Sequence, residues 1–268
     1  MQLPVVETVA EAYHAVWRHR RALAHLAAVP IAAVLVVGIG EHLLTDGPST
    51  DLPTTGGDGE GVGEGAGTDE GGAPAGGGPG LLGIAYLLAS LPFLMSWYRL
   101  IVEGPQAVAG RPPIAFGRLE GRFLLWVVLL GLVLAVPMVI AGTLAIPFMA
   151  GDVSGHELPI LPLLLAVFFF LLLVLASLRL SLIFPAVAVE EPASFPRAWE
   201  MTKGNSFRIA VAAVLVHVPA ILFGGILELA ALRLGLPFSL MLAVDLVISF
   251  TIMALGAAMF GEAYRRLR

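Results

Sequence analysis

Three ionisable residues near the end of the chain have a spacing that could support proton or ion movement. His217 and Glu228 are eleven residues apart, which is three helical turns, so they lie on one face of a helix. Glu228 and Asp245 lie on either side of a turn at 236–237, which places two carboxylates at a similar depth. Such a pair could share a proton or attract a cation, and the imidazole would extend the path.

A structural role is the alternative for the same three residues. Ionisable groups inside an apolar span are costly, so each one invites a functional hypothesis. Glu228 and Asp245 would lie near the lipid headgroups, however, where a carboxylate is tolerated and Arg233 could pair with Asp245. His217 could simply bond a backbone carbonyl, and both interpretations stay open.

Arginine and tryptophan residues form a second candidate site for lipid phosphate or for the membrane interface. Arg99, Arg179 and Arg265 each end an apolar run at a comparable depth, so they could gather around the phosphate of one lipid. Snorkelling of separate arginines to the headgroups is the simpler alternative. Trp17 and Trp199 lie close to these ends, and tryptophan is typical of interface anchors.

Positioning these residues requires helices that cross a membrane. The 268-residue chain is 58% hydrophobic and 13% charged, with a mean hydropathy of +0.90, which is more apolar than soluble domains are. About 20 helical residues cross a bilayer core. Six continuous apolar runs without strand alternation meet this length, at 22–44, 81–102, 123–149, 160–184, 209–232 and 240–260. We expect one all-α membrane domain over 1–268, a polytopic bundle of six transmembrane helices.

The distribution of positive charge predicts the orientation of these spans. If the N-terminus lies inside, fourteen of the fifteen Lys and Arg residues face the cytoplasm and only Arg233 faces out. Cytoplasmic flanks retain Lys and Arg, so both termini are expected in the cytoplasm. A cleaved signal peptide is the alternative, but the first apolar run is too long for one.

Two amphipathic segments are expected to lie along the inner membrane surface. The first, 3–20, places its apolar residues on one helical face, and the second, 194–204, has Pro196 in its first turn. The first face comprises Val6, Val9, Tyr13, Val16 and Trp17. Both segments carry an aromatic-x-x-x-Trp pattern before an odd-numbered span, which suggests three related hairpins arranged as a pseudo-repeat; chance agreement is the alternative.

The stretch 45–80 is expected to be a disordered external loop. It contains fourteen glycines, four prolines and seven acids, and no Lys or Arg. Such a composition lacks the apolar surface that would offset the entropy of ordering. Calcium binding is the alternative for so many acids, but the spacing of an EF-hand is missing.

Part of the sequence resembles a known group of bacterial membrane proteins. The stretch from Arg179 to Glu190, followed by the stretch from Ala198 to Arg208, is similar to the membrane domain found beside some glycerophosphodiester phosphodiesterases and to uncharacterised inner-membrane relatives. The stretch from Ser96 to Glu103 looks like a further copy of the first half. The resemblance implies a helical membrane module in the bacterial inner membrane. It implies no catalysis, because the soluble phosphodiesterase domain is missing from this sequence.

Motifs for catalysis are also missing. The sequence has no Walker loop, no dinucleotide glycine signature and no zinc-protease helix, and it contains no Cys. We therefore expect a non-enzymatic scaffold that engages lipids, another membrane protein or a second copy, with no cofactor, no metal and no nucleic acid. A small transporter or channel that uses His217, Glu228 and Asp245 is the alternative.

Overall fold

The computed structural model describes residues 2–45, 80–108, 117–149 and 160–268, and within this part of the chain all regular secondary structure is helical. The acidic stretch expected to be a disordered loop therefore lies, from 46 to 79, outside the described residues. The helices are α1 (Val5–Arg18), α2 (Arg20–Thr45), α3 (Leu81–Val102), α4 (Arg118–Met149), α5 (Ile160–Leu180), α6 (Ile183–Ala188), α7 (Phe195–Met201), α8 (Ser206–Arg233) and α9 (Phe238–Leu267), with a 3-10 turn η1 (Pro105–Val108) after α3.

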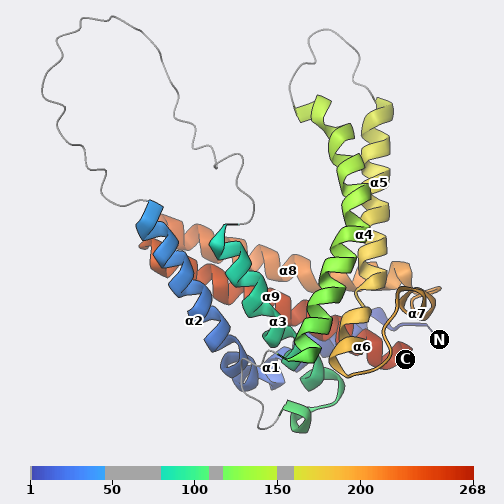
Figure 1. Cartoon of the computed structure of the whole chain (residues 1–268), viewed down its shortest axis with the longest axis horizontal. Helices are drawn as coiled ribbons and strands as arrows, with labels where there is room; N and C mark the ends of the chain where they lie inside the picture. Colours follow the sequence, from blue (N-terminus) through green and yellow to red (C-terminus); the bar gives the residue numbers. More distant parts are fainter. Residues whose placement is uncertain (1, 46–79, 109–116, 150–159) are drawn as a thin grey trace, which may run out of the picture.

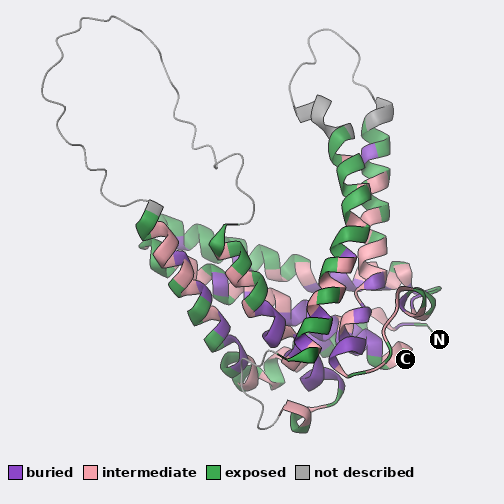
Figure 2. Cartoon of the chain, in the orientation of Figure 1, coloured by how far each residue is buried: buried purple, intermediate pink, exposed green. Residues whose placement is uncertain are grey.

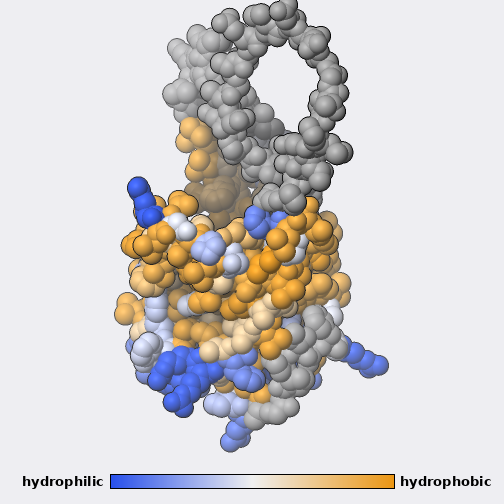
Figure 3. Space-filling model, turned by 90° about the vertical axis from the view of Figure 1, so that its left-hand side faces the viewer, coloured by the Kyte–Doolittle hydropathy of each residue, from blue (hydrophilic) through white to orange (hydrophobic). Residues whose placement is uncertain are grey.

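Six of these helices are long and apolar enough to cross a membrane, which confirms the expected bundle of six spans. Five of the spans are single helices, α2, α3, α4, α8 and α9, whereas the remaining one, Leu163–Ala188, runs from α5 through a turn into α6. The side of the molecule in Figure 3 carries a broad hydrophobic band above a hydrophilic lower edge. Such a band is what a bilayer requires of the surface it surrounds.

Consecutive spans pack against each other as three hairpins, α2 with α3, α4 with α5 and α8 with α9. Both chain termini lie at one end of the molecule, together with α1, α6 and α7 (Figure 1). We call this the basic end, because Arg18, Arg20, Arg265 and Arg266 lie there. The opposite, distal end holds the short turn between α8 and α9, where Gly235 adopts a positive φ of 62°.

The α4–α5 hairpin diverges from the other two hairpins as it leaves the basic end (Figure 1). Its contacts with the rest of the chain come mainly from α6, α7, α8 and α3. Figure 2 shows buried residues gathered where the hairpins meet near the basic end, while α4 and α5 are exposed along much of their described length. Large apolar side chains of the hairpin, such as Val136 of α4 and Phe168 of α5, are accordingly exposed.

Large side chains of α3 and α9 form the centre of the core. Phe93 packs edge-on against Phe250, with ring centroids 5.1 Å apart, and stacks near Trp97. The Trp97 indole N–H donates to the Ala254 carbonyl at 2.9 Å, so the polar group of this fully buried residue is satisfied. These contacts hold α3 against α9.

The N-terminal helix α1 packs against α8 and α9. It buries Thr8 and Ala12 in this contact, while Val6 and Trp17 on its other side are exposed. The apolar face expected from the sequence is therefore divided, because Val9 and Val16 pack against the core while Val6 and Trp17 do not. The second amphipathic segment forms the short helix α7, in which the Ser194 hydroxyl caps the first turn by accepting from the Arg197 amide.

Candidate functional site

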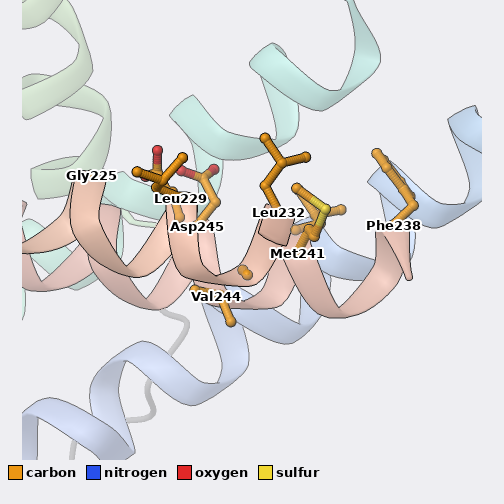
Figure 4. A pocket seen from close by; sticks show the side chains of 10 residues that line it. Gly225, Leu229, Leu232, Phe238, Met241, Val244 and Asp245 are labelled. Atoms are coloured by element: carbon orange, nitrogen blue, oxygen red, sulfur yellow. The ribbon is translucent and has the colours of Figure 1, made fainter. Parts of the chain in front are cut away.

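Glu228 and Asp245 line one cavity of about 520 Å³ between α8 and α9 near the distal end. The other lining residues are almost all apolar, and Figure 4 shows Asp245 beside Leu229 at one end of the cavity and Phe238 at the other. Both carboxylates project from exposed positions. The structure therefore brings these two of the three predicted intramembrane residues to the same apolar cavity.

His217 lies away from this cavity. Eleven residues separate it from Glu228, which is roughly 16 Å along the helix axis, too far for a shared proton. Its Nδ1 lies 2.8 Å from the Ala213 carbonyl oxygen one turn earlier, and its Nε2 lies against Gly256 of α9. A Cβ at Gly256 would come within 2.8 Å of that nitrogen, so the imidazole occupies a site that only glycine leaves open.

Arg99 is the most deeply buried of the three candidate arginines, and its guanidinium is held by hydrogen bonds. Its guanidinium is 5% exposed; Nε donates to the Ala188 carbonyl at 2.5 Å and one terminal nitrogen donates to the Glu190 carboxylate at 2.5 Å. Glu190 has a φ of 63°, a conformation that is unusual for a residue other than glycine. The ion pair joins the end of α3 to the turn after α6, and so links the first hairpin to the second.

Arg179 fastens the end of α5 to α7. Its Nε donates to the Thr202 hydroxyl at 2.9 Å, and a terminal nitrogen donates to the Trp199 carbonyl at 2.8 Å. The guanidinium also lies 3.5 Å from the centroid of the Trp199 ring, a cation–π contact. We call Arg179, Trp199 and Thr202 the α5–α7 latch.

Arg265 and Trp17 lie on other parts of the basic end. Arg265 pairs with Glu262 at 3.2 Å within α9, and the Arg20 guanidinium lies 5.1 Å from the Trp17 ring. The three arginines at the ends of even-numbered spans thus each have their own protein partners. A shared site for a lipid phosphate at these three arginines stays a prediction.

Glu191 is a polar hub that the sequence did not single out. It accepts a hydrogen bond from the Tyr264 hydroxyl at 2.6 Å, and it pairs with Arg268 at 2.9 Å and with Arg197 at 3.3 Å. The Tyr264 hydrogen bond, with the charges of the two arginines, lowers the pKa of Glu191 although partial burial opposes the shift. The consecutive carboxylates at 190 and 191, followed by a proline just after a span, were the available signal.

The N-terminal segment is held to the bundle by several bonds that the sequence also did not reveal. The Leu3 amide donates to Asn205 at 2.8 Å, and Arg208 donates to the Leu3 carbonyl at 3.0 Å. The Tyr13 hydroxyl donates to the Val216 carbonyl at 2.9 Å, in a turn of α8 that Pro219 weakens because proline has no N–H to donate. Partial burial raises the pKa of Tyr13, so its hydroxyl stays a donor.

Within the described residues, no group of three or more His, Asp or Glu side chains could hold a metal ion. Every buried side-chain nitrogen or oxygen in that part of the chain has a hydrogen-bond partner. Comparisons with protein-family models, with curated proteins and with solved structures found no match to this chain. The class that the fold defines is a multi-pass helical membrane protein.

Proposed function

We propose that this chain is a non-enzymatic docking module of the bacterial cytoplasmic membrane that binds another membrane protein, or a second copy of itself, through the α4–α5 hairpin. The inner-membrane location rests on the resemblance of the stretch from Arg179 to Glu190. The cytoplasmic placement of both termini rests on the basic residues gathered at their end of the molecule.

The exposure of the α4–α5 hairpin is the observation that carries this proposal. Only 11% and 6% of the most apolar windows of its two spans are buried, against 28% for α2 and α8 and 39% for α3. Helices associate in membranes through close packing, and among the described residues α4 and α5 pack chiefly against each other. Exposed apolar side chains of α4 and α5, such as Leu132, Val136 and Phe168, give a partner helix a surface on which to pack.

The α5–α7 latch supports the same surface from the basic end. Trp199 is 48% exposed and lies directly beside Arg179. Tryptophan and arginine are the residues most enriched at the centres of protein interfaces, because they combine a large apolar area with directed polar contacts. We therefore expect the same partner to contact the apolar surface of the hairpin and, at the level of the lipid headgroups, the α5–α7 latch.

The size of the complex in mild detergent tests the proposal. We expect the native protein to elute as a defined complex larger than one chain, and the double variant Arg179→Gln, Trp199→Ala to elute as a smaller species. Trp17→Ala is the matched control, since Trp17 is also exposed and also lies beside an arginine. A native protein that elutes as a single chain, or an equal loss in the control, would contradict the proposal.

A small transporter or channel is the second candidate, and the shared cavity of Glu228 and Asp245 favours it. Two carboxylates at an apolar cavity could carry a proton or a cation between solvent and the membrane interior. Reconstituted vesicles with an internal pH-sensitive dye would report such a flux. Flux that is the same for the native protein and for Asp245→Asn would exclude this function.

A further inference from the structure

We propose that one anionic diacyl phospholipid binds on the face of α9 that lies between α2 and α8, with one acyl chain in each of two grooves and its phosphate at Arg20. This site goes beyond the proposed function and shares no residue with the α4–α5 hairpin or the α5–α7 latch. A failure of either proposal therefore leaves the other one standing.

Two apolar grooves flank a ridge that Val247 and Thr251 form on α9. The groove between α8 and α9 has a volume of about 320 Å³ and is lined by residues such as Phe223 and Ile248. The groove between α2 and α9 has a volume of about 390 Å³ and is lined by residues such as Ala24 and Phe250. Val247 and Thr251 line both grooves, so the two lie side by side across a single helix.

The two grooves lie at the same depth along α9. Gly38 of α2 faces Leu242, and Gly224 of α8 faces Ile248, so both helices pack closely against α9. Each groove then extends from the level of Val247 toward the basic end. Two grooves that lie side by side and share the level of Val247 and Thr251 match the paired chains of one diacyl lipid.

Helix α1 and the start of α2 lie at the basic end of both grooves. Tyr13 lines the groove between α8 and α9, where its hydroxyl is held by the Val216 carbonyl. Arg20 lines the groove between α2 and α9, and Trp17, one turn beyond Tyr13 on α1, lies beneath its guanidinium. A lipid seated with its chains in the grooves would thus have its headgroup at the α1–α2 corner.

The charge at this corner favours a phosphate. Arg20 and Arg21 are both exposed there, and a guanidinium has five N–H donors in a planar fork that suits phosphate oxygens. One donor of Arg20 is used by the Trp17 carbonyl at 3.2 Å, which leaves further donors for a headgroup. Trp17 is 70% exposed and has the amphipathic ring typical of the headgroup level.

Other occupants fit the two grooves less well. An amphiphile with one acyl chain would fill one groove and leave the second to be filled separately. A lipid with two acyl chains and one anionic headgroup fits both features, because the chains fill the two grooves and the headgroup lies at the basic corner.

Native mass spectrometry of the delipidated protein, titrated with lipids of defined structure, tests this site. We expect phosphatidylglycerol to bind first at one molecule per chain and more tightly than phosphatidylcholine, while lysophosphatidylglycerol binds weakly. Arg20→Gln should weaken the first phosphatidylglycerol by about tenfold or more, because a charge-assisted contact to the phosphate is lost. This substitution lies on the surface, so folding should be unaffected.

Filling one groove provides an independent variant. Ala24→Trp places a large ring in the groove between α2 and α9, and it should abolish the first binding step. Leu132→Trp, at an exposed position of α4, is the matched control and should leave binding unchanged. Several equivalent lipids with no distinct first step, or equal affinity for the lysolipid, would overturn the proposal. An equal effect of Arg20→Gln on phosphatidylcholine would also overturn it.

Discussion

Arg99 and Glu190 form an ion pair between residues that are ninety-one positions apart in the chain, and it joins the first hairpin to the second. The guanidinium is buried, whereas the carboxylate is 59% exposed. Because a buried charge is costly without a partner, the pair specifies how the end of α3 meets the turn after α6.

Neutralising the carboxylate of this pair should destabilise the protein. Glu190→Gln leaves the buried Arg99 without its counter-charge, and we expect the free energy of unfolding to fall by about 1–3 kcal/mol. Titration with dodecyl sulfate, followed by tryptophan fluorescence, measures this change. Arg122→Gln, at an exposed position near the start of α4, is the control and should change the stability little. Equal stabilities of Glu190→Gln and the native protein would show that the pair contributes nothing.

The Glu191 hub should make the stability depend on acid pH. The folded-state pKa of Glu191 lies below its ordinary value of 4.5, mainly because Tyr264 donates to the carboxylate. Its contribution to stability is therefore complete above pH 4.5 and is lost as the pH falls through the lower folded value.

Comparison of two pH values tests this dependence. Glu191→Gln should be less stable than the native protein at neutral pH, and the difference should shrink at about pH 3.5. Glu200→Gln, at an exposed position of α7, should show no such change with pH. A difference for Glu191→Gln that stays constant between the two pH values would contradict the assignment of the hub.

Two adjacent glycines of α8 should respond differently to an added methyl group. A Cβ at Gly224 would lie 2.7 Å from the Ile248 side chain of α9, whereas a Cβ at Gly225 would meet nothing within 4 Å. We expect Gly224→Ala to destabilise the protein by about 1–3 kcal/mol through overpacking. Gly225→Ala should be neutral or slightly stabilising, because alanine is the better helix former. The same detergent titration measures both, and equal effects would rule out close packing of α8 on α9 at Gly224.

The Tyr13 hydroxyl should hold α1 against the proline-weakened turn of α8. Tyr13→Phe removes the bond to the Val216 carbonyl, and we expect a loss of about 0.5–1.5 kcal/mol together with faster amide exchange along α1. Hydrogen exchange followed by mass spectrometry would locate the change. Exchange along α1 that is as slow in Tyr13→Phe as in the native protein would mean that other contacts, such as those of Leu3, suffice.

The six spans could be predicted because a bilayer imposes length and apolarity on each segment separately. The apolar face of the N-terminal helix could also be predicted, since helical periodicity is a local property of the sequence. Which residues of this face pack on the bundle and which are exposed could not be predicted, because this depends on where α8 and α9 lie.

The partners of the candidate site residues could not be predicted for the same reason. The positions of Glu228 and Asp245 along their spans predicted that the two carboxylates lie at a similar depth, and in the structure both line one cavity. Depth alone could not show that His217 faces Gly256, nor that Arg99 meets Glu190 rather than a lipid. Such pairings depend on the rotation of each helix and on contacts between residues far apart in the chain.

Photo-cross-linking of the α4–α5 hairpin tests the docking function most directly. The chain contains no Cys, so a benzophenone can be attached at Val136→Cys on α4 or, as a control, at Leu222→Cys on α8. The two side chains are 64% and 63% exposed and lie at comparable distances from the basic end of their helices. We predict that irradiation in native membranes gives one discrete protein adduct at Val136→Cys and none at Leu222→Cys. Adducts with lipid alone at Val136→Cys, or the same protein adduct at both positions, would contradict the account.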